Sequence, residues 1–458
     1  MSQITKLLIA NRGEIACRIM ATCQRMDIAT VAVHSEADAG AAHVAAADEA
    51  VPIGPPPAPQ SYLRGDRIIN AAKATGAQAI HPGYGFLAES PDFARSVLEA
   101  GLIWIGPSPE IIASMGDKDR ARAIAQDAGV PILPGSPRFP VDQLDGLDEA
   151  ATAIGFPLLV KAACGGGGIG MRRVDRLEDL KGVVTATQSM AERSFGDGTI
   201  YLERFVARGG HVEVQVFGFG DGRAVHLFDR DCSVQRRYQK VIEEAPAPAL
   251  SEALREAMQA AAVSLAETVR YAGAGTVEFI YDVDRGEFHF LEMNTRIQVE
   301  HPATEMITGV DLVEWQIRQA AGMLDAAGQL AHAPALHAIE LRIYAERPEK
   351  NFLPAPGTIS KLNWPSEDDS LRIDHAVRDG DSITPFYDPM IAKLIARGPD
   401  RASAIARLVA ALAETRIEGV PTNIAFLASV LETPEFRDGE LSTDLIARMI
   451  PPRKVAGL

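Results

Sequence analysis

Residues 292–301 read Glu292-Met293-Asn294-Thr295-Arg296-Ile297-Gln298-Val299-Glu300-His301. Polar side chains occupy every second position from Glu292 to Glu300, in the order carboxylate, amide, guanidinium, amide, carboxylate. Because successive side chains of an extended segment point to opposite faces, these polar groups would share one face. They offer oxygen ligands for a cation, a clamp for an anion and a base, carried by one strand and the turn after it. The alternative is the solvated face of an edge strand, which alternates in the same way.

The composition is that of an ordinary globular protein and excludes several functions. The chain has 458 residues, of which 47% are hydrophobic and 23% charged, and this length favours two or three domains that share a cleft. The formal charge is −16, and without a basic stripe we expect no nucleic-acid partner. No apolar run reaches the roughly 18 residues of a membrane span, and the N-terminus does not read as a signal peptide. We therefore expect no membrane association.

The cysteines indicate a reducing compartment. Cys17, Cys23, Cys164 and Cys232 form no Cys-x-x-Cys pair and no zinc-like spacing. Reduced packing residues of this kind are typical of a cytoplasmic protein, which is the location we predict.

The N-terminal third alternates between strand and helix patterns, which predicts an open parallel α/β sheet. The predicted strands are 6–10, 29–34, 77–81 and 102–105, and the predicted helices are 13–26, 62–75 and 92–100. The proline-rich run from Pro52 to Pro59 is expected to be a surface connection without regular structure. One helix is expected from Pro109 to Ala128.

Beyond this helix the pattern changes. Residues 156–206 read as strand, glycine loop, strand, helix and strand, and this compact unit predicts a small separate lobe. Antiparallel signals dominate from His211 onward, with a long helix over 252–271. Residues 276–281 and 287–294 are predicted to form a hairpin.

The glycine loop follows Lys161 and contains Gly165 to Gly168. Consecutive glycines let backbone N–H groups close around a polyanion, so this loop suits phosphate. It is neither a Walker A loop nor a dinucleotide fingerprint, and a flexible hinge is the alternative. Lys161 favours the phosphate interpretation because it supplies positive charge at the strand end.

The predicted hairpin brings Glu278 opposite Glu292 and Asn294. Cross-strand neighbours on one face come within about 5 Å, and two carboxylates that close repel unless a cation or proton lies between them. Magnesium carried by ATP is the natural occupant of such a site. The alternative is that both carboxylates face water.

Two further basic residues, Lys240 and Arg342, are candidates for a binding site. Lys240 ends an arginine-rich run that starts at Asp229, and we expect it to point into a cleft, whereas the rest of the run suits a solvated face. Arg342 alternates with apolar neighbours in residues 337–343. It is predicted to protrude from a strand, with pairing to a structural acid as the alternative.

The chain resembles the biotin carboxylases of the ATP-grasp superfamily from Ile4 to about Leu445. The matching segments are 9–16, 81–87, the glycine run, 230–240, 292–302, 304–306, 337–342 and 421–423. The resemblance implies an α/β fold with an N-terminal open parallel α/β domain, an ATP-grasp lid lobe and a C-terminal α+β domain with an antiparallel sheet. The implied domains are 1–115 (N-terminal α/β), 116–208 (linker helices and lid lobe), 209–335 (metal, nucleotide and bicarbonate site) and 336–458 (C-terminal biotin carboxylase domain).

The resemblance also implies roles for individual residues. The implied ATP-binding residues are Lys118, Lys161, Gly167, Gly168, Met171, Glu203, Arg204, Phe205, Val206, His211, Tyr238, Glu278 and Glu292. Implied ligands for Mg²⁺ (or Mn²⁺) are Glu278, Glu292 and Asn294. Bicarbonate would be bound by Lys240, Arg296, Gln298 and Val299, and biotin by Arg342. The implied catalytic residues are Arg296, Glu300, Arg342 and Lys240.

The implied reaction is the ATP-dependent carboxylation of biotin by bicarbonate through carboxyphosphate, the first half-reaction of a biotin-dependent carboxylase. The implied partners are a biotin carboxyl carrier protein, a carboxyltransferase subunit and a second copy of the chain in a homodimer. Since no Met-Lys-Met-like biotinylation site is present, we expect a stand-alone subunit or the first component of a longer enzyme. The partner, not this chain, would choose the final carboxyl acceptor.

Two positions depart from the family pattern. Ile169 stands where the family usually carries a basic residue, and Tyr238 where it often has histidine. The alternatives are another ATP-grasp ligase that activates a different carboxylate, or a nucleotide-binding regulatory subunit without catalysis. A Rossmann dehydrogenase is disfavoured because the turn at residues 11–13 offers a single glycine.

Overall fold

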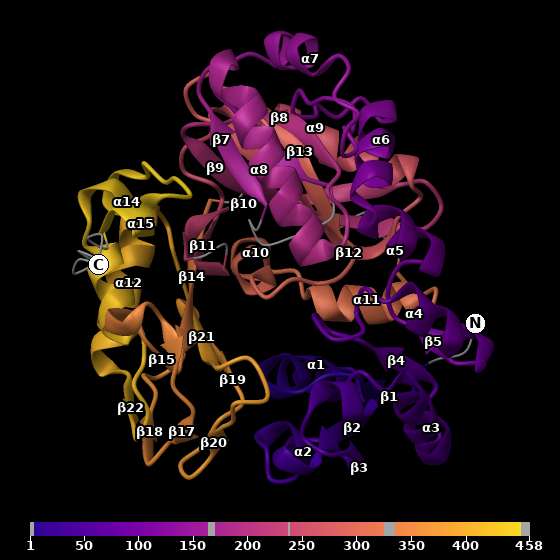
Figure 1. Ribbon diagram of the computed structural model, residues 1–458. Coiled ribbons are helices and arrows are strands. Elements are labelled where there is room, and N and C mark those ends of the chain that lie inside the picture. Colours follow the sequence, from indigo (N-terminus) through magenta and orange to yellow (C-terminus); the bar gives the residue numbers. More distant parts are fainter. Residues whose placement is uncertain (1–3, 164–169, 237–238, 325–334, 450–458) are drawn as a thin grey trace.

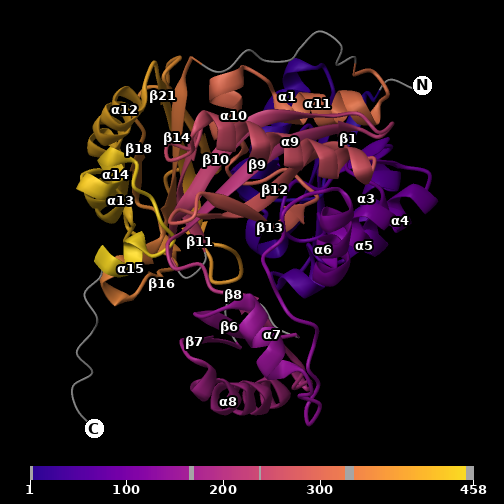
Figure 2. The ribbon, with the colours of Figure 1, turned by 90° about the horizontal axis from the view of Figure 1, so that it is seen from above.

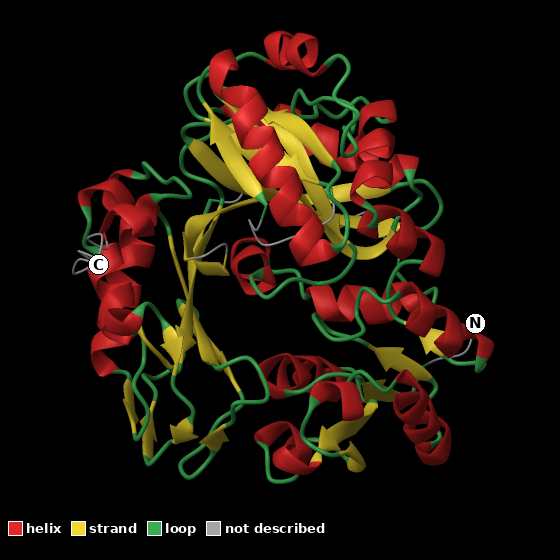
Figure 3. Cartoon of the chain, in the orientation of Figure 1, coloured by secondary structure: helices red, strands yellow, loops and turns green. Residues whose placement is uncertain are grey.

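The computed structural model describes residues 4–163, 170–236, 239–324 and 335–449. Its main layers are a five-stranded, a three-stranded and an eight-stranded sheet, each covered by helices (Figures 1 and 3). The three-stranded sheet and its helices project from the rest of the molecule, as the view from above shows (Figure 2). The mixed α/β class predicted from the sequence is confirmed.

The N-terminal sheet is parallel, as predicted. Its strand order is β3-β2-β1-β4-β5, with β3 Glu49–Gly54, β2 Ala29–Ser35, β1 Lys6–Ile9, β4 Ala79–His81 and β5 Ile103–Trp104. The accompanying helices are α1 Gly13–Arg25, α2 Ala42–Ala46, α3 Gly65–Thr75 and α4 Pro91–Glu99. The expectation that Pro52–Pro59 lacks regular structure was wrong at its start, because Pro52 pairs with His34 inside β3. β3 is an edge strand, where a missing N–H donor is tolerated.

The single helix expected over 109–128 is two helices, α5 Pro109–Gly116 and α6 Lys118–Asp127. Asp117 lies between them in an extended conformation, and its side chain accepts a hydrogen bond from the backbone N–H of Arg120. Asp117 therefore caps a new helix instead of continuing the old one.

The projecting lobe contains a three-stranded sheet of order β7-β6-β8, with β7 Met171–Val174, β6 Leu158–Ala162 and β8 Ile200–Arg204. Helices α7 Leu147–Ile154 and α8 Leu177–Phe195 cover it. Leu158, Val160, Leu180, Val184 and Leu202 form a core of its own. The small separate lobe predicted from the sequence is thus present in the described residues, and we call it the lid.

The eight-stranded sheet is antiparallel and forms the centre of the molecule. Its order is β13-β12-β9-β10-β11-β14-β21-β19, with β13 Glu287–Asn294, β12 Ala272–Asp282, β9 Gly209–Phe219, β10 Ala224–Arg236, β11 Gln239–Ala245, β14 His337–Tyr344, β21 Met390–Gly398 and β19 Leu371–His375. Helix α9 Glu252–Thr268 packs on β9 and β10. Helices α10 His301–Thr308 and α11 Leu312–Ala320 lie between this sheet and the N-terminal part of the chain (Figure 1).

The C-terminal end of this sheet is covered by α12 Arg401–Glu414, followed by α13 Ile424–Leu431, α14 Pro434–Asp438 and α15 Leu445–Met449. Three two-stranded sheets complete the fold: β15 Glu346–Arg347 with β16 Leu353–Pro354, β17 Gly357–Thr358 with β20 Ser382–Ile383, and β18 Lys361–Asn363 with β22 Arg416–Glu418. Among the described residues, no helix combines the length and the apolar character needed to cross a bilayer.

The predicted hairpin is present as β12 and β13, and Glu278 lies directly opposite Glu292. The extended row expected up to Glu300 is shorter than predicted, because β13 ends at Asn294 and residues 295–300 form a loop and turn before α10. The register shifts after Glu278, so that Leu291 and Glu292 are both exposed. The bulge thus breaks the simple two-residue alternation.

Candidate functional site

A cavity of about 510 Å³ opens between the N-terminal part of the chain and the large sheet. Its wall includes Tyr84 from the N-terminal side, Arg296 and Val299 from the turn after β13, and Arg342 and Tyr344 from β14. Residues that are far apart in the sequence thus meet around one hollow, which is the requirement for a binding site.

Lys240 is the centre of a buried carboxylate cluster beside this cavity. Its Nζ lies 2.6 Å from Glu213, 2.9 Å from Glu278 and 2.7 Å from Glu300. Burial lowers the pKa of Lys240, but these acids and Cys232 outweigh burial and hold it well above its usual range. Lys240 is therefore a permanent cation, and it points inward as the sequence predicted.

Arg342 bridges two acids at the cavity wall. Its Nη2 lies 2.6 Å from Glu243 and 2.9 Å from Glu300. Pairing with a structural acid, which the sequence left as an alternative, thus coexists with a position at the cavity. Burial raises the pKa of Glu243 to about 7 against the lowering effect of Arg342. For Glu300, Lys240 and Arg342 overcome burial and lower the pKa, so Glu300 is ionised at neutral pH.

The amide of Gln298 and the guanidinium of Arg296, both in the turn after β13, already make hydrogen bonds within the protein. Gln298 accepts a hydrogen bond of 2.8 Å from Arg230 and donates one of 2.8 Å to Glu278. Arg296 donates to Glu89 at 2.9 Å, and its Nη2 donates to the Asn294 side-chain oxygen at 2.9 Å. Lys240, Arg296, Gln298 and Glu300 therefore lie in one hydrogen-bond network, which fixes the direction of each donor.

The residues present fit a divalent cation. Glu278 and Glu292 are directly opposed, and Asn294 donates to Glu278 at 2.8 Å. Although the Glu292 side chain is exposed, partial desolvation and the charge of Glu278 raise its pKa. His211, whose Nε2 lies 2.8 Å from Glu278, adds a further donor to a set dominated by carboxylate oxygens. Such hard oxygen donors suit magnesium or manganese.

The predicted nucleotide residues divide between the lid and the large sheet. Lys161 of β6 lies 2.6 Å from Glu203 of β8, so these two are paired within the lid. Arg204 contacts Glu287 and His289 of β13, which joins the lid to the large sheet. In the lid, Arg173 of β7 also lies over the ring of Phe205.

Other predicted residues take the following places. Lys118 begins α6, Met171 begins β7, Val206 follows β8 and His211 is on β9. Gly167, Gly168 and Tyr238, with Ile169, lie outside the described residues.

Several functional neighbours were not predicted from the sequence. Glu213 and Glu243 are fully buried beside Lys240 and Arg342, and neither belongs to a motif that points to the site. Glu213 alternates with valines on β9, and a charge in such a position is the signal that could have identified it. Glu89, the partner of Arg296, lies in a loop that carries no such signal.

Family models match most of the chain. They are described as "Biotin carboxylase, N-terminal domain" over residues 3–112, "Carbamoyl-phosphate synthase L chain, ATP binding domain" over residues 117–326 and "Biotin carboxylase C-terminal domain" over residues 340–448. A biotin carboxylase of Halalkalibacterium halodurans is 49% identical over 96% of this chain and 97% of its own length.

Longer proteins also match. The α subunit of mitochondrial methylcrotonoyl-CoA carboxylase from Dictyostelium discoideum is 51% identical over 97% of this chain, which spans 63% of that subunit's length. Among solved structures, the biotin carboxylase domain dimer of Hydrogenobacter thermophilus 2-oxoglutarate carboxylase, in complex with MgADP, ADP and bicarbonate, is 43% identical. It superposes with a TM-score of 0.88 over 98% of each chain.

Proposed function

Because the chain belongs to the biotin carboxylase family, we propose that the site around Lys240 and Arg342 is where it carboxylates biotin. The chain is an ATP-dependent ligase, and its reaction is the carboxylation of biotin by bicarbonate. We propose that the reaction passes through carboxyphosphate and that a separate carrier protein presents the biotin.

The residues of the turn would bind bicarbonate and take its proton. In this proposal, Lys240, Arg296, Gln298 and the Val299 backbone would surround a bicarbonate ion that faces Glu300. Glu300 would accept the bicarbonate proton, and the resulting oxyanion would attack the γ-phosphate of ATP. The bond that breaks is the one between the γ-phosphorus and the bridging oxygen, so ADP leaves with that electron pair.

Arg342 would act in the second step. Carboxyphosphate breaks down to carbon dioxide and phosphate, and phosphate removes the proton from the biotin ring nitrogen, which then attacks carbon dioxide. Negative charge develops on the ureido oxygen during that attack. A guanidinium aimed at this oxygen stabilises charge that is absent from the ground state, an effect worth about 3 kcal/mol. The lid would exclude water, which would otherwise hydrolyse carboxyphosphate.

Glu278, Glu292 and Asn294 would hold Mg²⁺ or Mn²⁺, which when bound neutralises phosphate charge during transfer. The nucleotide would lie between the lid and the large sheet. The residues that we propose to contact it are Lys118, Lys161, Gly167, Gly168, Met171, Glu203, Arg204, Phe205, Val206, His211, Tyr238, Glu278 and Glu292.

We further propose the four domains given by the boundaries 1–115, 116–208, 209–335 and 336–458. A biotin carboxyl carrier protein and a carboxyltransferase are the proposed partners, since matched proteins are subunits or domains of biotin-dependent carboxylases. The H. thermophilus dimer supports a homodimer. The free state of Cys17, Cys23 and Cys232 supports the predicted cytoplasmic location.

The observation that carries this function is the position of Glu300, held between Lys240 and Arg342 beside the cavity. Phosphate release from ATP and magnesium should require bicarbonate and rise with free biotin. The Glu300→Gln variant should lose most of this activity while binding ATP normally. Release that responds to another carboxylate but ignores bicarbonate would indicate a different ATP-grasp ligase. No release under any of these conditions would favour a regulatory nucleotide-binding subunit.

A further inference from the structure

We propose that Lys393 is a positioning residue that fixes the turn carrying Glu300 in its bicarbonate-binding conformation, a role that rests on the function proposed above. Lys393 lies on β21 and has no exposed surface. Its Nζ donates a hydrogen bond of 2.9 Å to the carbonyl oxygen of Val299. None of the functions assigned so far uses this ammonium group.

A buried ammonium is costly unless it is paired, and Lys393 has two acids nearby. Glu14 of α1 lies 3.2 Å from Nζ and Asp374 of β19 lies 3.5 Å from it. Burial lowers the pKa of Lys393, but Glu14, Glu340 and Asp374 together outweigh burial and leave the pKa raised. Lys393 is therefore charged, and its shortest contact goes to the turn and not to either acid.

The carbonyl that Lys393 holds controls the direction of Glu300. The Val299 carbonyl and the Glu300 N–H belong to one planar peptide group, so fixing the oxygen orients the start of Glu300. The preceding carbonyl, that of Gln298, lies 2.7 Å from the ring Nδ1 of His301. Two successive carbonyls of the turn are thus anchored, one from α10 and one from the large sheet. In this conformation the Glu300 carboxylate reaches both Lys240 and Arg342.

The sheet register explains why Lys393 is suited to this role. Lys393 is directly opposite Arg342 on β14 and directly opposite Asp374 on β19. Opposed residues of antiparallel strands point to the same face, so Arg342 and Lys393 both approach the turn from one side. Arg342 contacts the Glu300 carboxylate and Lys393 contacts the backbone just before it. The two cations therefore hold the side chain and the main chain of the same turn.

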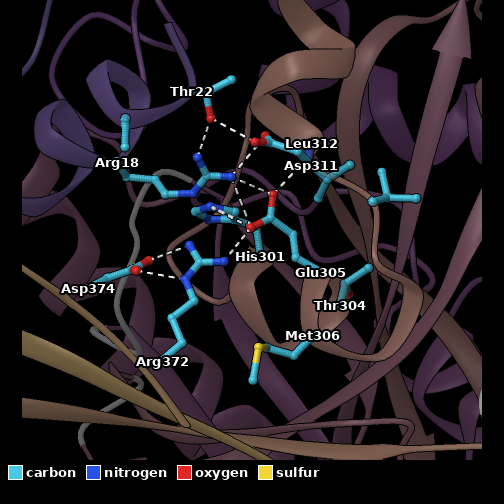
Figure 4. Close-up of polar contacts among 12 residues, drawn as sticks. Arg18, Thr22, His301, Thr304, Glu305, Met306, Asp311, Leu312, Arg372 and Asp374 are labelled. Atoms are coloured by element: carbon cyan, nitrogen blue, oxygen red, sulfur yellow. Dashed lines mark hydrogen bonds and ion pairs between the residues drawn. The ribbon is translucent and has the colours of Figure 1, made fainter. Parts of the chain in front are cut away.

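A second charge cluster supplies a matched control. Figure 4 shows Asp374 held by Arg372, which in turn contacts Glu305 and, through it, Arg18. Arg372 donates two hydrogen bonds of 2.7 Å to Asp374, so this carboxylate keeps a cation when Lys393 is removed. Asp374→Asn removes the ion pairs that this carboxylate makes with Lys393 and Arg372, without touching Val299. Glu14 is a poorer control because the hydroxyl of Tyr84, a cavity residue, donates to it.

The test compares Lys393→Met, Asp374→Asn and the double variant with the wild-type protein. Bicarbonate-dependent phosphate release from MgATP gives separate KM values for bicarbonate and ATP. Misplacing a reacting group by about 1 Å can cost up to 100-fold. We therefore expect Lys393→Met to lower kcat/KM for bicarbonate by about tenfold or more and to leave the KM for ATP unchanged. Asp374→Asn should change neither value.

The double variant separates positioning from folding. Asp374 keeps its pair with Arg372 when Lys393 is removed, so Asp374→Asn relieves no unpaired charge and the double variant should be less stable than Lys393→Met. The bicarbonate defect should persist if Lys393 acts through Val299. Equal losses for ATP and bicarbonate, or Asp374→Asn behaving like Lys393→Met, would overturn the role. If the wild type is active and the folded variants keep its KM for bicarbonate, the proposed role of Lys393 is wrong but the proposed function stands. If the wild type is inactive, the proposed function is wrong as well.

Discussion

Replacing Arg342 tests two roles that we propose for it, which are to stabilise the fold and to stabilise negative charge on biotin. Arg342 is buried and its Nη2 contacts both Glu243 and Glu300. Arg342→Ala removes the cation and leaves the buried Glu243 carboxylate without a partner. Breaking a buried ion pair in this way lowers the free energy of unfolding by about 3–5 kcal/mol. That is a large part of the roughly 5–15 kcal/mol by which a domain is stable. Activity lost in the alanine variant alone would therefore be ambiguous.

Arg342→Lys resolves the ambiguity. It keeps the positive charge beside Glu243 but loses the planar five-donor fork, so a lysine paired with the two acids no longer presents guanidinium N–H groups to the cavity. Losing an aimed donor costs about 100-fold to 1,000-fold in kcat, or about 3–4 kcal/mol. We expect biotin-dependent turnover to fall by this factor in Arg342→Lys, with ATP affinity unchanged. A steady-state assay with and without free biotin, together with nucleotide binding by calorimetry, measures both quantities.

A matched variant checks the stability part of the reasoning. The double variant Arg342→Ala/Glu243→Gln has no unpaired carboxylate at position 243. Its free energy of unfolding should therefore recover most of the loss seen in Arg342→Ala. Turnover with biotin should not recover, because nothing faces the ureido oxygen. Normal biotin-dependent turnover in Arg342→Lys would refute the proposed role of Arg342, and recovered turnover in the double variant would refute it equally.

The remaining predictions concern the metal, pH and stability. Glu278→Gln should raise the magnesium concentration needed for half-maximal phosphate release by about 10-fold to 100-fold, as a titration at saturating ATP would show; an unchanged requirement would contradict its role as a ligand. Burial and the facing carboxylate on β11 raise the pKa of Asp231 to about 7. The folded state therefore holds a proton that the unfolded state releases, and stability falls as pH rises toward 7. Between pH 6 and pH 8 the wild type should lose about 1.4 kcal/mol that Asp231→Asn keeps, measured by urea unfolding; parallel pH curves would contradict this. Glu305 contacts Arg18 at 2.8 Å and Arg372 at 2.7 Å, so Glu305→Ala should cost about 3–5 kcal/mol in the same assay, and a loss below 1 kcal/mol would show that the cations relax to solvent.

Local patterns predicted most elements of the fold because hydrophobic periodicity reports directly on which face is buried. The hairpin followed from alternation and a turn signal, but the bulge at Leu291, which brings Glu292 opposite Glu278, did not. Errors arose where one residue outweighs its neighbours. Asp117 caps a helix inside an otherwise continuous helical pattern, and Pro52 is tolerated because β3 has a free edge. The Asp117 cap is a local signal that the continuous helical pattern obscured, whereas the free edge of β3 is visible only in the tertiary structure.

The candidate site was predicted only in part from the sequence, for a physical reason. Motif residues such as Lys240 and Glu300 could be named because they resemble a family pattern, but their acidic partners come from other strands. Glu213 is on β9 and Glu243 on β11, and each is fully buried in a position that would be apolar in an ordinary core. Which cation neutralises such an acid depends on strand order, which the local pattern does not contain.

The electrostatics of the pocket explain how Glu300, the base that we propose, can accept a proton despite its low pKa. Without substrate, Lys240 and Arg342 stabilise the Glu300 carboxylate and lower its pKa, which makes it a weak proton acceptor. Lys240 contacts three carboxylates and has three N–H donors, so a bicarbonate oxygen can bind Lys240 only by displacing one of them. If the displaced acid is Glu300, it loses a charge-assisted hydrogen bond and faces an anion, and both changes raise its pKa. Substrate binding would therefore create the base that the reaction needs, at the moment when the proton to be removed is within reach.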